Sequence, residues 1–507
     1  MLRISGSHRR LCDGVSRRDV LQACGLGALG AGAADWNALR ASPAIEAASI
    51  PGFGKAKSVI MLFLYGGASQ LETFDPKPEA PIEVRGKLGS IESSLPGCRV
   101  CEGLPNLARV MDRTTVVRSM THPFPIHGTA FSVTATPFLD TPMQDNPRDA
   151  RHWPFIGSIV DYLDEQQGRA AADVPRNVGM PFLHSSRRKH PIHNAGPYAA
   201  FLGQAYDPIW TDFEGEALHS QKYHFASTIT TAIDPYGGVK PDCQFQWAKG
   251  EATPAELTLD RLSLRRSLLE QFDLARRDLD AQSRIREFSR TQDRAFAYLT
   301  NPRLREALDL KRESISLREQ YGMTLFGQSS LVARRLVEAG SRFVTVFWDE
   351  YGSVNSAWDT HYWHYPRLTE QLLPGLDRAY SALILDLEQR GLLDETLVLC
   401  ITEHGRTPKL DPHGDHPSGT GHGGRNHWSR AYSSVLAGAG ICRGKVVGRT
   451  DRIAGEVEET PVSPQDILAT TYHLLGIDPH SLIHDRTGRP YAVGGNGRIL
   501  HEVLAQG

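Results

Sequence analysis

"SVIMLFLYGG", from Ser58 to Gly67, is a continuous apolar run that ends in two glycines. An uninterrupted apolar run of this length is typical of a strand buried on both faces, as in the parallel sheets of α/β proteins. Four further runs predict strands of the same kind: Thr114–Met120, Arg342–Asp349, Thr396–Thr402 and Tyr432–Gly440. The sequence therefore predicts one sheet with a buried centre.

Helical patterns separate these runs. Leu372–Gly391 has helical spacing and ends at a glycine, directly before the fourth run. Ser463–Gly476 begins with Ser463 as the expected N-cap, Pro464 at the first helical position and Asp466 in the first turn. Strands that alternate with helices predict an α/β fold, a three-layer α/β/α sandwich with a mainly parallel sheet.

Two segments have a different texture. Residues 253–340 are dense in Arg, Asp, Glu and Leu at helical spacing, which predicts a helical insertion packed on the sheet. Its arginines fit a solvated helical face, or else a surface for a polyanion. Residues 121–250 are rich in Pro, Gly, His and aromatic residues with weak periodicity, as in long functional loops.

Length and charge exclude some classes of protein. The chain has 507 residues, a net charge of −2 and 40% apolar residues, enough for a sizeable core. We expect one α/β domain over residues 55–507. The balanced charge gives no electrostatic reason to expect a nucleic-acid partner.

The first 48 residues predict an export signal and linker. "SRRDVL" (Ser16–Leu21) resembles a twin-arginine signal, and a short Gly/Ala-rich apolar stretch follows it. That stretch is too short and too weakly apolar to span a membrane, so no transmembrane span is expected in the mature chain. An amphipathic helix, or a lipid-modified Cys24, is the alternative. The expectation is export by the twin-arginine (Tat) machinery to the periplasm or cell surface.

Cysteine usage indicates no disulfide framework. Five cysteines follow the signal, and only Cys98 and Cys101 are closely spaced. With no second pair to complete a zinc site, we expect an incidental pair or a local disulfide there.

Chemically active side chains follow the predicted strands. Ligands of open α/β sheets bind at the carboxyl ends of the strands. The residues found at those ends are Glu72 and Asp75 after the first run, His127 and Thr129 after the second, Asp359 and His361 after the third, and Glu403, His404, Arg406, Arg425 and His427 around the last two. Carboxylates and histidines are thus predicted to gather at one edge of the sheet.

This combination favours a divalent metal. Carboxylate and imidazole ligands suit zinc, with manganese, magnesium or calcium as alternatives, as one ion or as two about 4 Å apart. Arg406 and Arg425 are candidates to hold anionic oxygens of a substrate. Taken singly, each histidine also fits a structural role, and Glu403 fits an ion pair with Arg406. His413, His416 and His422 lie in a Gly/Pro-rich loop and are weaker candidates.

The chain resembles the DUF1501 family from about Lys57 to Leu504. The motifs that carry the resemblance occur in order: "FLYGGASQLETFDPKPEAP" (63–81), "RSMTH" (118–122), "FLGQAYDP" (201–208), "RRLVEAGSRFVTV" (334–346), "WDTH" (358–361), "RGLLDETLVLCITEHGRTPK" (390–409), "GRNHW" (424–428) and "PVSPQDILATTYHLLGID" (461–478). The resemblance implies the alkaline phosphatase-like superfamily, which includes sulfatases and phosphodiesterases.

The resemblance also implies roles for particular residues. "TEHG" (Thr402–Gly405) is similar to the superfamily's Asp-His-Gly metal motif, with Glu403 in place of aspartate. Asp359 and His361 would serve a second ion, and His427 would be a late histidine ligand. The first strand lacks the expected aspartate at Tyr65, so Glu72 or Asp75 would replace it, or that ligand is lost. Thr129 or His127 is nearest to the nucleophile position, and the sulfatase signature Cys/Ser-x-Pro-x-Arg is absent.

Three functions remain open from the sequence. The first is a metal-dependent hydrolase of phosphate or sulfate esters, with a small-molecule or polysaccharide substrate. The second is a catalytically inactive surface or polysaccharide-binding protein on the same scaffold. The third is a structural partner in a surface complex, with the helical segment as its docking face.

Overall fold

The computed structural model describes residues 50–168, 174–189, 194–221, 232–248, 301–353, 355–411 and 423–505. From Pro51 onward these residues belong to one compact unit, Pro51–Gly507. Three predicted features lie outside the described residues: the export signal and linker over residues 1–48, residues 253–300 of the helical segment, and His413, His416 and His422.

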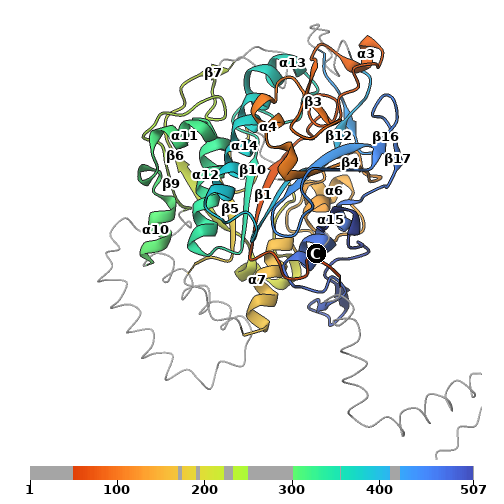
Figure 1. Ribbon diagram of the computed structural model, residues 1–507. Coiled ribbons are helices and arrows are strands. Elements are labelled where there is room, and N and C mark those ends of the chain that lie inside the picture. The colour runs from red at the N-terminus through yellow and green to blue at the C-terminus, as the bar shows by residue number, and fades with distance from the viewer. Residues whose placement is uncertain are drawn as a thin grey trace, which may run out of the picture. The chain divides into compact units, whose positions relative to one another are not determined.

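A nine-stranded sheet forms the centre of this unit (Figure 1). Its strand order is β15 (Lys445–Val447), β4 (Thr114–Met120), β14 (Tyr432–Ala437), β11 (Thr396–Thr402), β1 (Ser58–Leu64), β10 (Phe343–Trp348), β5 (Asn177–Met180), β6 (Ile209–Glu214) and β9 (Gln244–Trp247). The pairs from β11 through β6 are parallel, whereas β14 and β9 run antiparallel to their neighbours. The predicted α/β class with a mainly parallel sheet is confirmed.

The apolar runs occupy the middle of the sheet. Every residue of β1, β10 and β11 is buried, as expected for strands covered on both faces. A fully buried Leu or Phe in these strands contributes about 1.5–3 kcal/mol relative to an exposed one. The centre of the sheet therefore supplies much of the energy that fixes where the strand ends lie.

Helices cover opposite faces of the sheet. Along β10, Phe343 packs against Phe155, at the start of α7 (Ile156–Gln166), at a ring-centroid distance of 5.6 Å. Trp348 has the opposite parity in the strand and packs against Phe326 of α12 (Leu325–Ala339) at 4.7 Å. Because successive side chains of a strand alternate between faces, α7 and α12 lie on opposite sides.

The helix boundaries follow their capping signals. α14 (Leu373–Gln389) packs beside α12 and is followed by Gly391 at φ +69°, and α15 (Pro464–Leu474) begins at the predicted cap. Ser463 Oγ accepts from the Asp466 N–H at 3.2 Å, and the Asp466 carboxylate accepts from the Ser463 N–H at 2.8 Å. This is a complete capping box, which satisfies two otherwise unpaired backbone donors.

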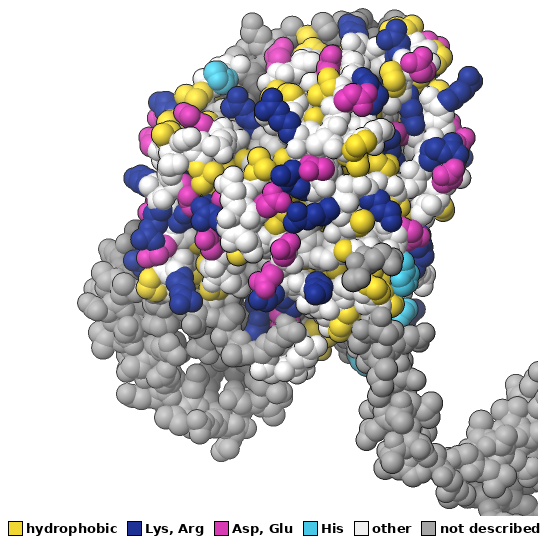
Figure 2. Space-filling model, viewed as in Figure 1, with side chains coloured by type: hydrophobic (Ala, Val, Ile, Leu, Met, Phe, Trp, Pro, Cys, Tyr) yellow, Lys and Arg dark blue, Asp and Glu magenta, His cyan; other side chains and the backbone are white. Residues whose placement is uncertain are grey.

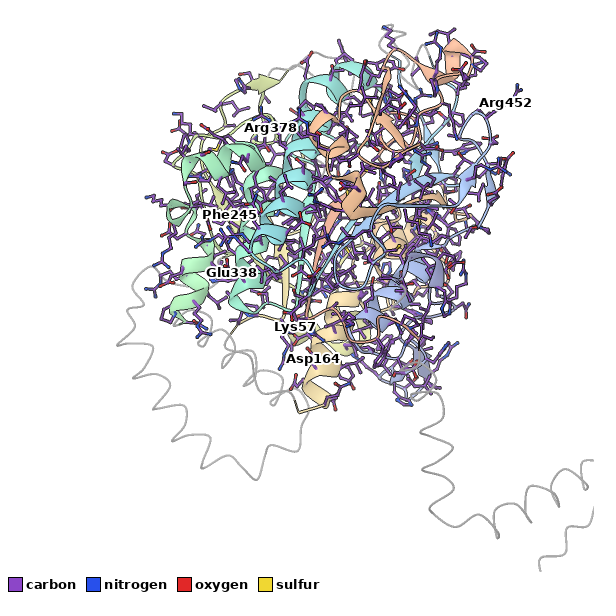
Figure 3. The ribbon with its side chains drawn as sticks, in the orientation of Figure 1. Lys57, Asp164, Phe245, Glu338, Arg378 and Arg452 are labelled. Atoms are coloured by element: carbon purple, nitrogen blue, oxygen red, sulfur yellow. The ribbon has the colours of Figure 1, made fainter. Side chains whose placement is uncertain are left out.

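The helical segment is described from residue 301 onward. It contains α10 (Pro302–Leu308), α11 (Ile315–Tyr321) and α12, and α12 packs directly on β1 and β10. Glu338 of α12 and Arg378 of α14 are exposed on the outside of this helical layer (Figure 3). Figure 2 shows basic and acidic side chains interspersed over this view of the molecule.

Residues 121–250 are more regular than the sequence indicated. They supply α5 (Thr129–Val133), α6 (Thr141–Gln144), α7 and the strands β5, β6 and β9. β5 has only four residues, too few for a detectable period, and its place is set by pairing with β10. Cys98 and Cys101 are buried free thiols. Every helix in the described part of the chain is too short or too polar to cross a bilayer.

Candidate metal centre

The carboxyl ends of the central strands converge on one site. β1 leads into Tyr65-Gly66-Gly67, and β11 leads into Glu403-His404. Gly66 and Gly67 have φ of +93° and +90°. A Cβ on Gly66 would lie only 2.4 Å from the Asp359 backbone nitrogen, and a Cβ on Gly67 would lie only 2.4 Å from His404 Nδ1. The double glycine therefore makes room for two site residues, which explains its place after the strand.

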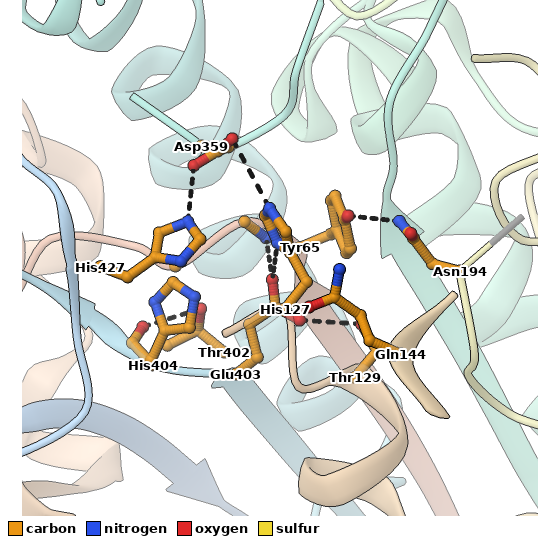
Figure 4. A network of polar contacts seen from close by, with 12 residues as sticks. Tyr65, His127, Thr129, Gln144, Asn194, Asp359, Thr402, Glu403, His404 and His427 are labelled. Carbon is orange, nitrogen blue, oxygen red and sulfur yellow. Dashed lines mark hydrogen bonds and ion pairs between the residues drawn. The ribbon is translucent and has the colours of Figure 1, made fainter. Parts of the chain in front are cut away.

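The Asp359 carboxylate is close to three imidazoles, and Figure 4 shows two of them, those of His127 and His427. Its Oδ1 lies 3.1 Å from the Nε2 of both His361 and His427, and its Oδ2 lies 3.7 Å from the Nε2 of His127. His427 comes from the short ribbon β12–β13 (Gly405–Arg406 and His427–Trp428). Residues from three separate segments of the chain thus meet at one carboxylate.

The outer nitrogen of every histidine in the site is held by an acceptor. The Nδ1 donors and their acceptors are His361 to Asn426 Oδ1 at 2.7 Å, His404 to the Gly405 carbonyl at 2.9 Å, His127 to Glu403 Oε1 at 3.0 Å and His427 to the Pro125 carbonyl at 3.3 Å. In a neutral imidazole such a bond fixes the tautomer with its lone pair on Nε2, as in the outer shell of known metal sites. The imidazoles of His361, His404 and His427 are oriented as ligands, whereas His127 is shared between the carboxylates of Glu403 and Asp359.

His404 gives the clearest sign that a partner belongs in this site. Its side chain is fully buried, and its Nε2 has no hydrogen-bond partner among the described residues. Burial, together with His427 and Arg406, holds the pKa of His404 well below its ordinary value. Burial likewise lowers the pKa of His427 to about 4. Both imidazoles are therefore neutral at pH 7, the form that binds metal.

Two overlapping sets of side chains have ligand atoms within 4.8 Å of one another. They are His127, His404 and His427, and Asp359, His361 and His427. Imidazole with one carboxylate suits zinc first, and also manganese or iron. The buried unpaired nitrogen and this donor set fit a divalent ion.

Glu403 lies beside this cluster, and its carboxylate is engaged on both oxygens. Oε1 accepts from the Gly66 N–H at 2.8 Å and from His127, and Oε2 accepts from the Thr129 hydroxyl at 2.9 Å. Burial favours the neutral acid, but the hydrogen bond and charge of His127 lower the pKa of Glu403 below its ordinary value. Burial lowers the pKa of His127, yet Glu403 and Asp359 raise it overall to about 9. The structure thus pairs Glu403 with His127.

Arg406 connects Asp359 to the backbone around the site. Its fully buried guanidinium donates to Asp359 Oδ1 at 2.5 Å, to the carbonyls of Gly66 and Gly67, and to the Arg425 carbonyl at 3.1 Å. Arg406 and His361 hold the pKa of Asp359 well below its usual range against the effect of burial. The structure therefore corrects the expected role of Arg406 from binding a substrate anion to fixing Asp359.

Arg425 requires a similar correction. It is fully buried, and its five N–H donors have acceptors in Glu72 and in the carbonyls of Val84, Thr407 and Pro408. The Glu72 ion pair measures 2.6 Å, and it outweighs burial to lower the Glu72 pKa. No donor of Arg425 is left for a substrate. Glu72 is held in this pair and is in neither ligand set.

Asp75 lies apart from the cluster. It forms ion pairs with Lys77 at 3.0 Å and Arg118 at 3.5 Å, and it accepts from the Thr450 hydroxyl. These partners line a different cavity, of about 610 Å³. The structure therefore brings together Asp359, His361, Glu403, His404, His427, His127 and Thr129, but not Asp75.

Several residues of the site were not predicted. Tyr65, which replaces the expected aspartate, stacks on His127 at 5.2 Å, and its hydroxyl accepts from the Asn194 amide (Figure 4). His122, which follows the second predicted strand in the sequence, donates to the Glu403 carbonyl at 2.7 Å, a partner that the sequence did not indicate. Asn426 stands between two candidate residues in "GRNHW", and this position was the only signal for its role.

The fold and the site together define an α/β sandwich protein with a candidate metal centre at the carboxyl edge of its sheet. The chain belongs to the family "Protein of unknown function (DUF1501)", whose model matches residues 56–504. This confirms the family expected from the motifs. No curated protein matches the chain significantly.

Solved structures offer only distant likenesses. The lipoteichoic acid synthase LtaP from Listeria monocytogenes is 11% identical, with a TM-score of 0.33, 86% of this chain covered and 78% of that chain. The phosphonate monoester hydrolase SpPMH from Silicibacter pomeroyi is 12% identical, with a TM-score of 0.32 and coverage of 89% and 76%. A protein in the alkaline phosphatase superfamily from Vibrio parahaemolyticus is 11% identical, with a TM-score of 0.34 and coverage of 90% and 72%. At these scores the likenesses carry no argument about this site.

Proposed function

We propose that the protein is a metal-dependent hydrolase of phosphate or sulfate esters, built on an alkaline phosphatase-like scaffold. One observation carries the proposal: the imidazoles of His361, His404 and His427, each held at Nδ1, leave Nε2 available as a ligand, and the Nε2 of His404 is buried without a partner among the described residues. His427 would hold the ion together with His404, or with Asp359 and His361, the residues of the two candidate sets. A divalent ion there supplies Lewis-acid polarisation of an ester oxygen.

The residues of this chain would position the reacting groups. Thr129, at the start of α5, donates a hydrogen bond to Glu403 at 2.9 Å, so Glu403 is placed to take the hydroxyl proton when the Thr129 oxygen bonds to the phosphorus or sulfur of an ester. The bond from that atom to the alcohol oxygen breaks in this step and the alcohol leaves; water then hydrolyses the group held on Thr129 and restores its hydroxyl. His127, held between Glu403 and Asp359, is about one-fifth exposed, as are the edges of His361 and His427. The ester group would approach from this open side.

The binding-protein alternative also has a specific observation in its favour. Thr129 is almost completely buried, all five N–H donors of Arg425 have protein acceptors, and four of the five of Arg406 do. Such a site binds a ligand through its metal without providing a nucleophile. Small-molecule or polysaccharide esters are the ligands we propose in either case.

Metal analysis and ester assays test the proposal together. Protein purified after export is analysed by inductively coupled plasma mass spectrometry, then assayed on p-nitrophenyl phosphate, bis-p-nitrophenyl phosphate and p-nitrophenyl sulfate. We expect a bound divalent metal, ester hydrolysis abolished by a chelator, and loss of both in His404→Ala. His480→Ala, at an exposed histidine, should match the wild type. An absence of metal, with no effect of His404→Ala, would refute the hydrolase; a metal-loaded but inactive protein would favour the binding protein.

We also propose that residues 1–48 direct twin-arginine export to the periplasm or cell surface, on the motif "SRRDVL". Replacing Arg17 and Arg18 with lysine should retain the unprocessed precursor in the cytoplasm, as seen by cell fractionation and immunoblotting. Unchanged appearance of the mature protein outside the cytoplasm would contradict this route.

A further inference from the structure

We infer that the centre binds one metal ion, not two, and that Glu403 lies outside the coordination shell as the partner of His127. This inference rests on the metal centre of the proposed function and specifies its composition. It departs from the expectation that Glu403 is itself a ligand.

The two candidate ligand sets share a single nitrogen. Both sets need His427. Its Nδ1 donates to the Pro125 carbonyl at 3.3 Å, and a carbonyl only accepts, so the lone pair of the ring is on Nε2. One lone pair binds one ion. The sets around His404 and around Asp359 are therefore alternative descriptions of one centre rather than two independent sites.

The Glu403 carboxylate is already satisfied by donors that an ion would have to displace. The Gly66 N–H is fixed by the backbone turn after β1, and the Thr129 hydroxyl and the His127 Nδ1 complete the set at 2.9 and 3.0 Å. The carboxylate has no exposure to solvent. A carboxylate whose oxygens all accept from protein donors beside the ion takes the position of an outer-shell group, as carboxylates around metal sites often do.

The side chain at the end of β1 offers no further charge. Tyr65 lies with its ring parallel to His127, at an interplanar angle of 13°, and its hydroxyl is bound by Asn194. Tyr65 therefore offers neither a carboxylate nor an imidazole to a divalent ion. His127 itself fills the space between the two carboxylates, with Nδ1 at Glu403 and Nε2 3.7 Å from Asp359. Among the described residues, this side of the site thus presents an aromatic ring and hydrogen-bond donors where a second ion would need ligands.

Metal stoichiometry tests this inference independently of activity. Metal-free full-length protein is titrated with Zn²⁺, and separately with Mn²⁺, by calorimetry, and bound metal is counted by mass spectrometry after desalting. We expect one ion per chain in the wild type. Glu403→Gln should still bind one ion, with an affinity weaker by about 10–100-fold, as for other outer-shell partners. His427→Ala should bind none, since both ligand sets need it. Glu456→Gln, at an exposed glutamate paired with Arg430, is the matched control and should keep wild-type affinity.

The outcomes separate this inference from the proposed function. Two ions in the wild type and one in Glu403→Gln would overturn the inference and leave the hydrolase intact. One ion without hydrolysis of any ester would uphold the inference and reject the hydrolase. No bound ion would reject both. Because the wild-type count decides the question, the test does not depend on any variant folding.

Discussion

Gly67→Ala is the substitution that tests the geometry of the centre most directly. Gly67 contacts the ring of His404 from the turn after β1, and it is not a candidate ligand. Adding one methyl group at this position changes neither charge nor hydrogen bonding. Any loss of metal affinity therefore reports the position of His404.

The structure sets the size of the effect. Gly67 has φ of +90°, where an L-residue costs about 1–2 kcal/mol. The new Cβ would lie 2.4 Å from His404 Nδ1, whereas real Cβ atoms essentially never approach closer than 3.0 Å. The ring has to move by roughly 0.6 Å, about three times the roughly 0.2 Å tolerance of a metal–ligand distance. We expect the metal dissociation constant to rise by about 10–100-fold, as it does when outer-shell partners are disturbed. This rise corresponds to a loss of about 1.4–2.8 kcal/mol of binding free energy.

Gly488→Ala is the matched control. Gly488 has φ of +83°, and a Cβ there would meet nothing within 4 Å, so it carries the backbone strain without the clash. Zn²⁺ affinity is measured by competition with a chromophoric chelator, and stability by urea unfolding. Both variants should lose about 1–2 kcal/mol of stability, but only Gly67→Ala should lose metal affinity. Wild-type affinity in Gly67→Ala, with the strain detected, would refute the placement of His404 as a ligand.

Three further predictions concern the rest of the fold. Arg334 is fully buried among three carboxylate ion pairs of 2.5, 2.7 and 2.8 Å, so Arg334→Ala should lower the free energy of unfolding in urea by about 3–5 kcal/mol. Arg449→Ala, at an exposed ion pair, should have a much smaller effect, and equal losses in the two variants would contradict this assignment. Burial raises the pKa of Asp234 to about 6, against the hydrogen bonds it accepts, so the folded state binds this proton more tightly than the unfolded state does. Stability from this group should fall by up to about 3 kcal/mol as pH rises from 4 to 6, and urea titrations of Asp234→Asn should lack that slope; an unchanged slope would show that other groups cause it. Burial raises the pKa of the Cys101 thiol to about 12, so this thiol should react with iodoacetamide only after unfolding. The partly exposed Cys442 should react in the native protein, and peptide mass spectrometry distinguishes the two sites. Rapid labelling of Cys101 in the native protein would contradict its burial.

The central strands could be predicted from the sequence because their signal is local. β4 and β11 begin and end at the predicted residues, and β1 and β10 lie within their predicted runs. A strand buried on both faces needs an unbroken apolar run, whatever its neighbours are. β5 could not be found in this way, since its four residues gain their place only by pairing with β10.

The residues of the site were recognisable by type, but their roles were not. From the sequence, Arg406 and Arg425 were candidates to bind a substrate anion. The fold buries both side chains, and their N–H groups donate to Asp359, Glu72 and backbone carbonyls. An arginine far from its partners in sequence gives no signal of which acceptors it will meet. Asp75 was likewise grouped with the site by its place after β1, but the chain turns it toward Lys77.

Glu403 and His404 show most clearly what each level decides. The sequence by itself determined that a carboxylate and an imidazole follow a buried strand, and that a glycine pair closes the first apolar run. Only the tertiary structure decided that Glu403 meets the Gly66 N–H, His127 and Thr129, while His404 presents an unpaired nitrogen beside His427. The physical reason is that hydrogen-bond partners and metal ligands are chosen by distances of about 3 Å between segments that lie hundreds of residues apart along the chain.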